Sequence, residues 1–500
     1  MQMESASGKT AVPQVRPQPM PAAATMPVAR SHMGTSCLLA ASVLLCALLL
    51  PQRRLHGDDT DHYVVLLQGG HPEGLVRHVG YLPFVSVLLS MLRPFGGGAF
   101  QALLLASALG AAVAAFCLHR AARLLAPADL RPAAVAVAAV VLPAAWYFAT
   151  AAEAHGVFAG AAAAAWWAFA RWRLAPGGRF ALVLDVLTGA AWLLHSFGAL
   201  LLPWFVSGRW LLSERERRPR AGELAVAVIA FLAVGGLGSL GLGGSALGQV
   251  RGAWSFLQDW CEPVVPTAAI AMVWWEWLLP FGPWSLLAWF GLLSRRSRPW
   301  ALVTVVGLLL HAPFLVVLLA RTDLRQELGA YLLPLALPAV LAGLAWLPRV
   351  CHWPAIAAGA ALALGLVMPS WRPLADPAFV AGVQELRRER PFALLVDAAE
   401  LEGVRMHVEG VVCAEALRTF GTVLGGAPMD GEALAGWFDG CVLALTRDGA
   451  PLLVTDAARA AIAAAPWPAL RSLWETHIRS TYRCEVFACR GLRGTLLLPR

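Results

Sequence analysis

Residues 36–62 read SCLLAASVLLCALLLPQRRLHGDDTDH, an apolar run that ends in a cluster of three carboxylates. The apolar part, 36–51, is close to the length at which a helix crosses a bilayer. Similar runs recur along the chain, which is 58% hydrophobic and only 14% charged. A water-soluble core does not need that much apolar sequence, so we predict a polytopic α-helical membrane protein. A cleaved signal peptide is the alternative for 36–51, but the long polar tail before it favours an uncleaved span.

We expect about eleven transmembrane helices. They lie approximately at 36–51, 98–118, 133–151, 156–172, 180–196, 198–212, 222–245, 277–293, 300–320, 330–348 and 355–370. Trp is frequent at the ends of these runs, which is typical of interfacial belts. The residues are Trp146, Trp166, Trp167, Trp204, Trp210, Trp274, Trp275 and Trp277. Lys and Arg fall mostly in the loops on the N-terminal side, and this excess predicts a cytoplasmic N-terminus.

The sequence divides into three regions. Residues 1–35 are rich in Pro, Ala, Met, Ser and Gln without periodicity, which predicts a disordered cytoplasmic tail. Residues 36–370 form the transmembrane domain, and its external loop 52–97 is expected to carry helices along the membrane surface, because its apolar part is too short to span. Residues 371–500 are expected to form a soluble external α/β domain.

Within 371–500 we expect buried strands at 392–397, 441–446 and 451–456. Helical stretches alternate with them near 378–389, 456–464 and 467–477. Four cysteines of this region, Cys413, Cys441, Cys484 and Cys489, allow one or two disulfides in an oxidising compartment. The chain has no CxxC pair, so a zinc site is not expected.

Composition excludes several kinds of chemistry. Lys9 is the one lysine, so arginine carries almost all of the net charge of +8. Schiff-base catalysis and phosphate binding by a P-loop both require a lysine in the site. Neither is therefore expected, and no nucleic-acid partner is expected.

Asp58, Asp59 and Asp61 follow the first span directly. Carboxylates at a membrane surface can deprotonate a hydroxyl or hold a divalent cation. If the segment after Gly57 is helical, Asp58 and Asp61 share one face and Asp59 is offset from it. Acids also suit a helix N-terminus, and both interpretations can hold together.

Further candidates lie where spans end. Glu153 and His155 follow the third span, and His195 ends the fifth. A solvated loop end is the alternative for Glu153, and a hydrogen bond between helices is the alternative for His195, although an ionisable group at that depth is a functional candidate. Glu276, within Trp274-Trp-Glu276-Trp277, is interpreted as a lone acid in an interfacial belt.

The last charged external loop contains Arg325 and leads into Tyr331. The planar guanidinium of arginine matches the oxygens of a phosphate that projects from the lipid surface. Pairing of Arg, Asp and Glu side chains within this loop is the alternative.

Four elements in order carry a resemblance to a known family. They are Gly57-Asp58-Asp59-Thr60-Asp61, His71-Pro72-Glu73-Gly74, Trp146 followed by Glu153-Ala154-His155, and Gly189 followed by His195. With this set the chain resembles the GT-C superfamily of polyprenyl-phosphate-sugar-dependent membrane glycosyltransferases. It is more closely similar to a bacterial multispanning family of unknown-function domains, related to the eukaryotic transmembrane O-mannosyltransferase of plexin-type receptors. Asp61 stands where that family has Glu, and His155 where it has Tyr.

The resemblance implies an inverting transfer of sugar from a polyprenyl-phosphate donor to a hydroxyl of a protein, glycan or lipid acceptor. Asp58 would be the general base, with Asp61 and Glu153 as its partners or as ligands of a divalent Mg or Mn ion. Arg325 would hold the phosphate, and Asp59, His71, His155, His195 and Tyr331 would line the substrate site. The implied location is the bacterial inner membrane, with the C-terminal domain outside. A transporter or lipid flippase is the alternative, but such proteins usually carry polar or broken helices near the midplane.

Overall fold

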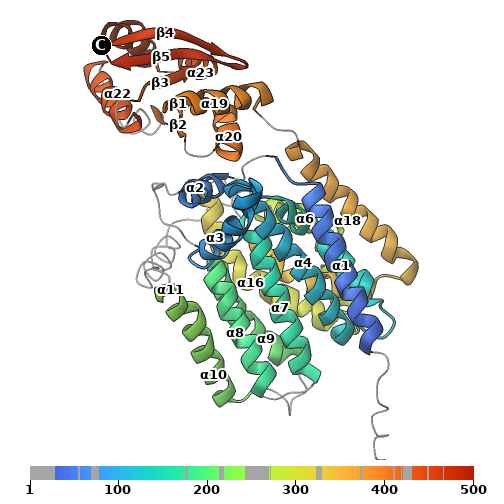
Figure 1. Ribbon diagram of the computed structural model, residues 1–500. Helices are drawn as coiled ribbons and strands as arrows, with labels where there is room; N and C mark the ends of the chain where they lie inside the picture. Colours follow the sequence, from blue (N-terminus) through green and yellow to red (C-terminus); the bar gives the residue numbers. More distant parts are fainter. Residues whose placement is uncertain are drawn as a thin grey trace, which may run out of the picture.

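The computed structural model shows a helical bundle and a smaller part built on a β-sheet (Figure 1). The described residues are 29–53, 57–68, 78–174, 178–212, 219–241, 270, 272–321, 329–371, 375–408, 411–417, 419–420, 431–446, 450–465 and 467–499.

Helices cover most of the described residues of each apolar segment expected to span. Their bounds are α1 Ala29–Leu49, α4 Ala99–Leu125, α5 Pro132–Val140, α6 Pro143–Thr150, α7 Ala154–Leu174, α8 Gly178–Leu194, η2 Ser196–Leu200, α9 Leu201–Leu212, α10 Ala221–Phe231, η4 Leu232–Leu237, α11 Gly238–Gly241, η5 Val273–Leu278, α14 Leu279–Phe281, α15 Pro283–Phe290, η6 Gly291–Leu293, α16 Arg298–Arg321, η8 Ala330–Leu335, α17 Ala336–Trp346, η9 Arg349–Cys351, α18 His352–Val367 and η10 Met368–Trp371.

Within the described residues, four helices are long and apolar enough to cross a membrane. They are Ala99–Leu125, Ala221–Leu240, Arg298–Val316 and Arg349–Trp371. The pair α5 and α6, bent by 64°, forms a fifth if it counts as one broken span. The protein is thus predominantly helical with several membrane-length helices, and the count of eleven spans stays a prediction.

Small residues let α4 and α7 pack with their backbones in contact. A Cβ atom added to Gly110 of α4 would lie 2.3 Å from the carbonyl oxygen of Gly156 in α7. One added to Gly160 would lie 2.7 Å from the Gly110 carbonyl oxygen. In a membrane, lipid removes the hydrophobic driving force between helices. Close packing through small residues then stabilises their contact.

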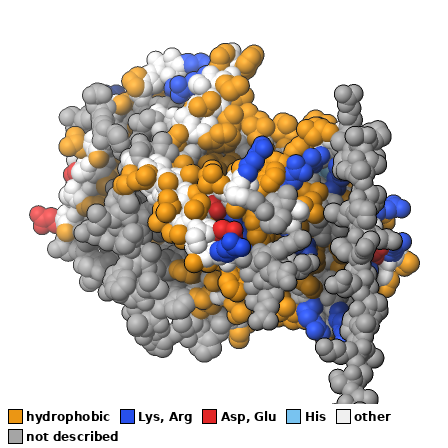
Figure 2. Space-filling view, turned by 90° about the horizontal axis from the view of Figure 1, so that it is seen from below, with side chains coloured by type: hydrophobic (Ala, Val, Ile, Leu, Met, Phe, Trp, Pro, Cys, Tyr) orange, Lys and Arg blue, Asp and Glu red, His pale blue; other side chains and the backbone are white. Residues whose placement is uncertain are grey.

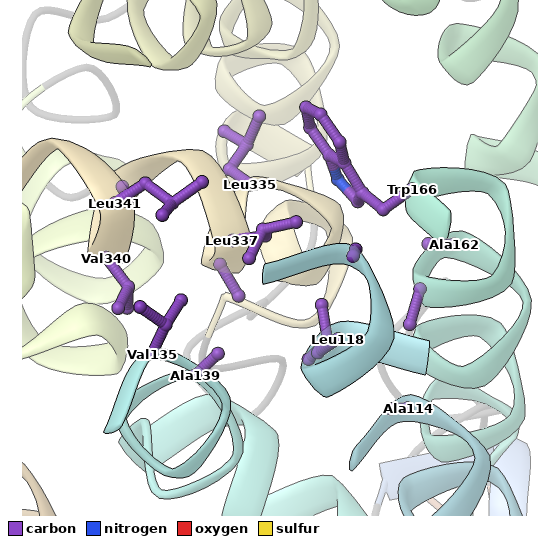
Figure 3. Close-up of a cluster of buried hydrophobic side chains, with 14 of the residues drawn as sticks. Ala114, Leu118, Val135, Ala139, Ala162, Trp166, Leu335, Leu337, Val340 and Leu341 are labelled. Carbon is purple, nitrogen blue, oxygen red and sulfur yellow. The ribbon is translucent and has the colours of Figure 1, made fainter. Parts of the chain in front are cut away.

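Buried aliphatic side chains and Trp166 fill a core cluster of the bundle (Figure 3). Trp166 of α7 lies among residues of α4, α17 and η8, and its indole N–H donates to the Pro334 carbonyl over 2.9 Å. Trp204 donates in the same way to Val303. Of the eight Trp residues assigned to interfacial belts, Trp166, Trp204 and Trp277 are buried inside the protein, so the assignment is wrong for these three; Trp210 and Trp274 are exposed. A buried indole needs an acceptor, and irregular backbone such as η8 supplies one.

The arginine-rich loops lie at one end of the bundle. Figure 2 looks onto this end and shows Lys and Arg side chains around a mainly hydrophobic surface with few acids. Asp129, in the loop between α4 and α5, pairs with Arg296. These are the loops predicted to be cytoplasmic, and the sidedness itself stays a prediction.

The opposite end carries two short helices, α2 (Gly57–Leu67) and α3 (Tyr81–Leu92), followed by η1 (Arg93–Phe95). One face of α3, with Tyr81, Val85, Leu88 and Leu89, is buried against the bundle. The other face exposes Phe84, Val87 and Met91. A helix with two apolar faces fits a place beside lipid.

The C-terminal part has a five-stranded sheet in the order β2-β1-β3-β5-β4. β1, β2 and β3 are parallel, and β5 pairs antiparallel with β3 and β4. The strands are β1 Ala393–Val396, β2 Val412–Glu415, β3 Leu452–Thr455, β4 Tyr482–Cys489 and β5 Leu492–Pro499, and the helices are α19 Pro377–Glu389, α20 Ala398–His407, α22 Gly431–Leu445, α23 Asp456–Ala464, α24 Pro468–Ser472, η12 Leu473–Ile478 and α25 Arg479–Thr481.

Alternating side chains of this sheet enter two cores. Leu394 and Val396 of β1 pack with Phe379 and Val383 of α19. Leu395 faces the other way, into the cluster that contains Phe438 of α22. Period-two alternation between two covered faces makes a three-layer α/β arrangement.

The strand expected at 441–446 is wrong. These residues belong to the last turns of α22, where Leu434, Phe438 and Val442 are buried at a spacing of four. A short apolar run cannot by itself distinguish a buried strand from a buried helix. The strands β1 and β3 are confirmed, as are helices over 378–389 and 456–464.

The disulfides that the four cysteines of this region allow are not formed in the structure, where all four cysteines are free. Cys413 lies on β2 and Cys484 and Cys489 lie on β4. These strands form opposite edges of the sheet, too far apart for the short Cα separation that a disulfide needs.

Candidate functional site

Glu153 lies at the end of the bundle that carries α2 and α3, between α6 and α7, and only 1% of it is exposed. Its Oε2 accepts a hydrogen bond from the backbone N–H of Ala154 over 2.7 Å. Its Oε1 accepts one from the Thr60 hydroxyl over 3.1 Å. Thr60 belongs to α2, so this carboxylate joins the acid-bearing helix to the bundle.

Ser107 of α4 fixes the backbone of Glu153. The serine hydroxyl donates to the Glu153 carbonyl over 2.7 Å and accepts from the Glu153 N–H over 3.2 Å. Thr60 also donates to the Ala152 carbonyl over 3.0 Å. The hydroxyls of Ser107 and Thr60 therefore supply hydrogen-bond partners for the backbone of the turn between α6 and α7. Buried backbone N–H and C=O groups require such partners.

Tyr81 begins α3 and is fully buried beside this carboxylate. Burial raises the pKa of the Tyr81 phenol, the negative charge of Glu153 raises it further, and the Ser107 hydroxyl opposes both effects. The N–H of Gly80, just before it, donates to the Leu193 carbonyl of α8 over 3.0 Å. Tyr81 is therefore held in place as a protonated phenol next to Glu153.

Three buried imidazoles meet beside the same turn. The ring centroids of His78 and His195 are 4.3 Å apart with nearly parallel planes, and those of His155 and His195 are 4.7 Å apart. The Tyr331 ring lies 5.5 Å from His155 and 5.6 Å from His195. Four elements of the chain thus contribute to one cluster.

Four of the predicted site residues are brought together in this way: Glu153, His155, His195 and Tyr331. The predicted acids Asp58, Asp59 and Asp61 belong to α2, and their side chains lie outside the described residues. His71 and Arg325 also lie outside them, so their roles stay predictions.

A metal ion would need several carboxylate or imidazole ligands at one point. Across the described ranges, no group of three or more His, Cys, Asp and Glu side chains could hold one. Both Glu153 oxygens already accept hydrogen bonds from the protein. A metal held by Asp58, Asp61 and Glu153 stays a prediction.

Sequence reasoning missed Thr60, Ser107, His78 and Tyr81, and it misjudged Glu276. Glu276 is fully buried, and its Oε2 accepts from the Gly329 N–H over 3.1 Å. Gly329 has a φ of +74° and precedes η8, which carries Tyr331. The signal was present, because an acid inside an apolar run has a specific partner by default.

No protein-family model and no curated protein matches the sequence. Solved structures do match. ArnT from Cupriavidus metallidurans bound to undecaprenyl phosphate aligns with a TM-score of 0.52 and 16% identity, over 93% of this chain and 98% of that chain. The apo state of the same ArnT aligns with a TM-score of 0.52 and 15% identity, over 94% of this chain and 98% of that chain. The apo oligosaccharyltransferase of Archaeoglobus fulgidus aligns with a TM-score of 0.49 and 11% identity, over 93% of this chain and 74% of that chain.

The likeness to ArnT extends over almost the whole of both chains, which shows the fold. The chain therefore has the fold seen in ArnT, and the fold expected from the resemblance to the GT-C superfamily is confirmed. The closer relation to the unknown-function family stays a prediction.

Proposed function

We propose that the protein is an inverting membrane glycosyltransferase that moves a sugar from a polyprenyl-phosphate donor to an acceptor hydroxyl. The observation that carries this proposal is the hydrogen bond from Thr60 to Glu153. It joins the helix with three aspartates to a buried cluster of carboxylate, imidazole and phenol groups. The GT-C fold supports the same reaction class, although a fold alone does not fix an activity.

The proposed chemistry is a displacement at the anomeric carbon. Asp58 takes the proton of the acceptor hydroxyl, whose oxygen attacks the anomeric carbon from the face opposite the phosphate. The bond from the anomeric carbon to the phosphate oxygen breaks as the new glycosidic bond forms, and polyprenyl phosphate leaves with the electron pair. Configuration inverts because bond formation and bond breaking occur on opposite faces.

The other groups have supporting roles in the proposal. Glu153 and Asp61 hold the acceptor, or a divalent ion that would stabilise the charge of the leaving phosphate. Arg325 binds the phosphate through its planar fork. Asp59, His71, His155, His195 and Tyr331 line the sugar and acceptor sites, and the acceptor is a protein, glycan or lipid hydroxyl.

The direct test uses purified protein with a panel of polyprenyl-phosphate monosaccharides, with and without EDTA. The measurement is release of polyprenyl phosphate and transfer of labelled sugar. Asp58→Asn is expected to fold and to lose transfer, whereas Glu223→Gln, an exposed acid in the first turn of α10, should keep it. Near-normal transfer by a correctly inserted Asp58→Asn protein would remove this base from the mechanism.

The same purified protein also tests the alternative function, a transporter or lipid flippase. Substrate flux across proteoliposomes without any turnover would identify a transporter or flippase instead. Turnover without flux supports the enzyme.

A further inference from the structure

Two buried histidines next to Phe197 each keep one ring nitrogen unused. Within the described part of the chain, His195 Nε2 and His311 Nε2 have no hydrogen-bond partner, and both residues are fully buried. The Phe197 ring centroid lies 6.1 Å from that of His195 and 6.3 Å from that of His311. Because unmade hydrogen bonds of buried polar groups are unfavourable, such atoms indicate a missing partner.

The other nitrogen of each ring fixes the position of the proton. The backbone N–H of Phe197 donates to His195 Nδ1 over 3.2 Å, so the neutral ring carries its proton on Nε2. His311 Nδ1 lies 2.8 Å from the Gly307 carbonyl oxygen. A carbonyl only accepts, so His311 is protonated on Nδ1 and its Nε2 is an acceptor. The unused pair is therefore one donor and one acceptor.

Two further aromatic rings lie near Phe197. The Phe197 and Tyr331 centroids are 4.1 Å apart, and the Phe314 centroid lies 6.5 Å from that of Phe197. All three side chains are only partly buried, in contrast to the two histidines. Aromatic side chains combined with a few placed polar atoms are the usual lining of a small-molecule site.

One free nitrogen donates and the other accepts, so the two histidines can distinguish the sugar from the phosphate of the proposed polyprenyl-phosphate sugar. A sugar hydroxyl both donates and accepts, so hydroxyls on one sugar ring can satisfy His195 and His311 together. The oxygens of an ionised phosphate only accept, which would leave His311 Nε2 unpaired. We propose that His195 and His311 bind hydroxyl groups of the transferred sugar, with its C–H face against Phe197 and Tyr331. This assignment rests on the proposed function and excludes the phosphate from this position.

The test compares the binding of undecaprenyl phosphate with that of undecaprenyl-phosphate monosaccharides by the wild-type protein and by variants. His195→Phe and His311→Phe remove the free donor and the free acceptor and should each weaken binding of the sugar-linked lipid roughly fivefold. Binding of undecaprenyl phosphate should stay unchanged. The matched control is His352→Phe, because its Nε2 already contacts the Leu344 carbonyl elsewhere in the bundle.

A second set of variants keeps the hydrogen bond made by Nδ1 of each histidine. These variants test the proposal if a Phe variant misfolds. His195→Asn retains an acceptor for the Phe197 N–H, and His311→Asn retains a donor for the Gly307 carbonyl. Both variants lack a polar atom at the position of Nε2. Both should lose the preference for the sugar-linked lipid, whereas the longer His195→Gln and His311→Gln should keep most of it. Gel filtration and thermal unfolding report on the fold of each variant.

The possible results separate cleanly. Equal weakening of both lipids, or weakening of neither, overturns the sugar subsite while the glycosyltransferase proposal stands. Binding of free monosaccharide that competes with the sugar-linked lipid supports the subsite, since the same hydroxyls are recognised without the lipid. Failure of the wild-type protein to bind or turn over any of these lipids overturns the proposed function, and the subsite with it.

Discussion

The Thr60 hydroxyl donates to Glu153 Oε1 over 3.1 Å, which joins α2 to the turn between α6 and α7. Thr60 is fully buried, and it shares its face of α2 with the buried residues Tyr63 and Val64. The position of the acid-bearing helix therefore depends on a neutral hydroxyl residue inside the aspartate cluster.

We expect Thr60→Val to lower transfer at least tenfold and Thr60→Ser to keep it. Valine preserves the shape but removes the single hydroxyl proton that Glu153 Oε1 and the Ala152 carbonyl share. The free energy of unfolding should fall by about 1–3 kcal/mol. Transfer assays and thermal unfolding in detergent measure the two effects. Full activity of Thr60→Val would show that α2 is positioned without this bond.

Glu153→Gln is expected to reduce transfer by roughly 100-fold or more and to change the titration of Tyr81. The raised pKa of the Tyr81 phenol comes first from burial and then from the Glu153 charge. A neutral amide removes the second cause, so the phenol should ionise at a lower pH than in the wild-type protein. Difference ultraviolet titration of Glu153→Gln, with Tyr81→Phe to assign the signal, measures this. An unchanged tyrosinate titration would contradict the electrostatic contact.

Glu400 predicts a pH dependence in the C-terminal sheet. Burial raises the pKa of its carboxyl, although the Thr455 hydroxyl donates to it. Because the folded pKa exceeds the unfolded value of 4.5, the stabilising contribution is complete below about pH 4.5 and is lost as the pH rises through the folded value. Glu400→Gln should then protect β1 from hydrogen exchange more strongly at neutral pH than the wild-type residue does. The exposed Glu432→Gln serves as control, and equal exchange in both variants would contradict the prediction.

Much of the fold was predictable because apolar helices leave a strong signal in a single sequence. The segments at 98–118 and 300–320 coincide with α4 and α16, since lipid-facing and buried positions are both apolar. The hairpin β4–β5 was missed. Strand β4 alternates exposed and partly buried residues at the sheet edge, so its hydrophobicity is too low to stand out.

The candidate site was predictable mainly where ionisable groups end a span. Glu153 and His195 stand out from their apolar neighbours, and charge is costly there. Thr60 and Ser107 do not stand out, because small hydroxyl residues occur throughout apolar helices and only a tertiary contact gives them a role. His78 lies just before α3 and Tyr81 begins it, and nothing in the local sequence signals their contacts with the bundle.

Gly110→Ala should destabilise the bundle by about 1–3 kcal/mol. The new Cβ would lie 2.3 Å from the Gly156 carbonyl oxygen, a backbone atom that moves only if α4 and α7 separate. Gly365→Ala in α18 is the matched control, since a Cβ there meets nothing within 4 Å and alanine favours the helix. Thermal unfolding in one detergent compares the variants. A stable Gly110→Ala protein would contradict the close contact of α4 and α7.

The buried ion pair of Arg209 and Asp185 predicts a non-additive double mutant. Arg209 Nη2 lies 2.5 Å from Asp185 Oδ1, and the two side chains are 1% and 3% exposed. Arg209 also lies over the Trp172 ring at 5.5 Å. Asp185→Leu leaves a buried guanidinium without its counter-charge, and Arg209→Met leaves the carboxylate, so each should cost about 3–5 kcal/mol.

The combination of Asp185→Leu with Arg209→Met removes both charges from the α8–α9 contact. It should therefore be more stable than either single variant, because apolar residues of similar volume replace a buried ion pair at little cost. A double-mutant cycle by thermal unfolding measures the coupling free energy. Purely additive effects would show that the two charges do not compensate each other inside the bundle.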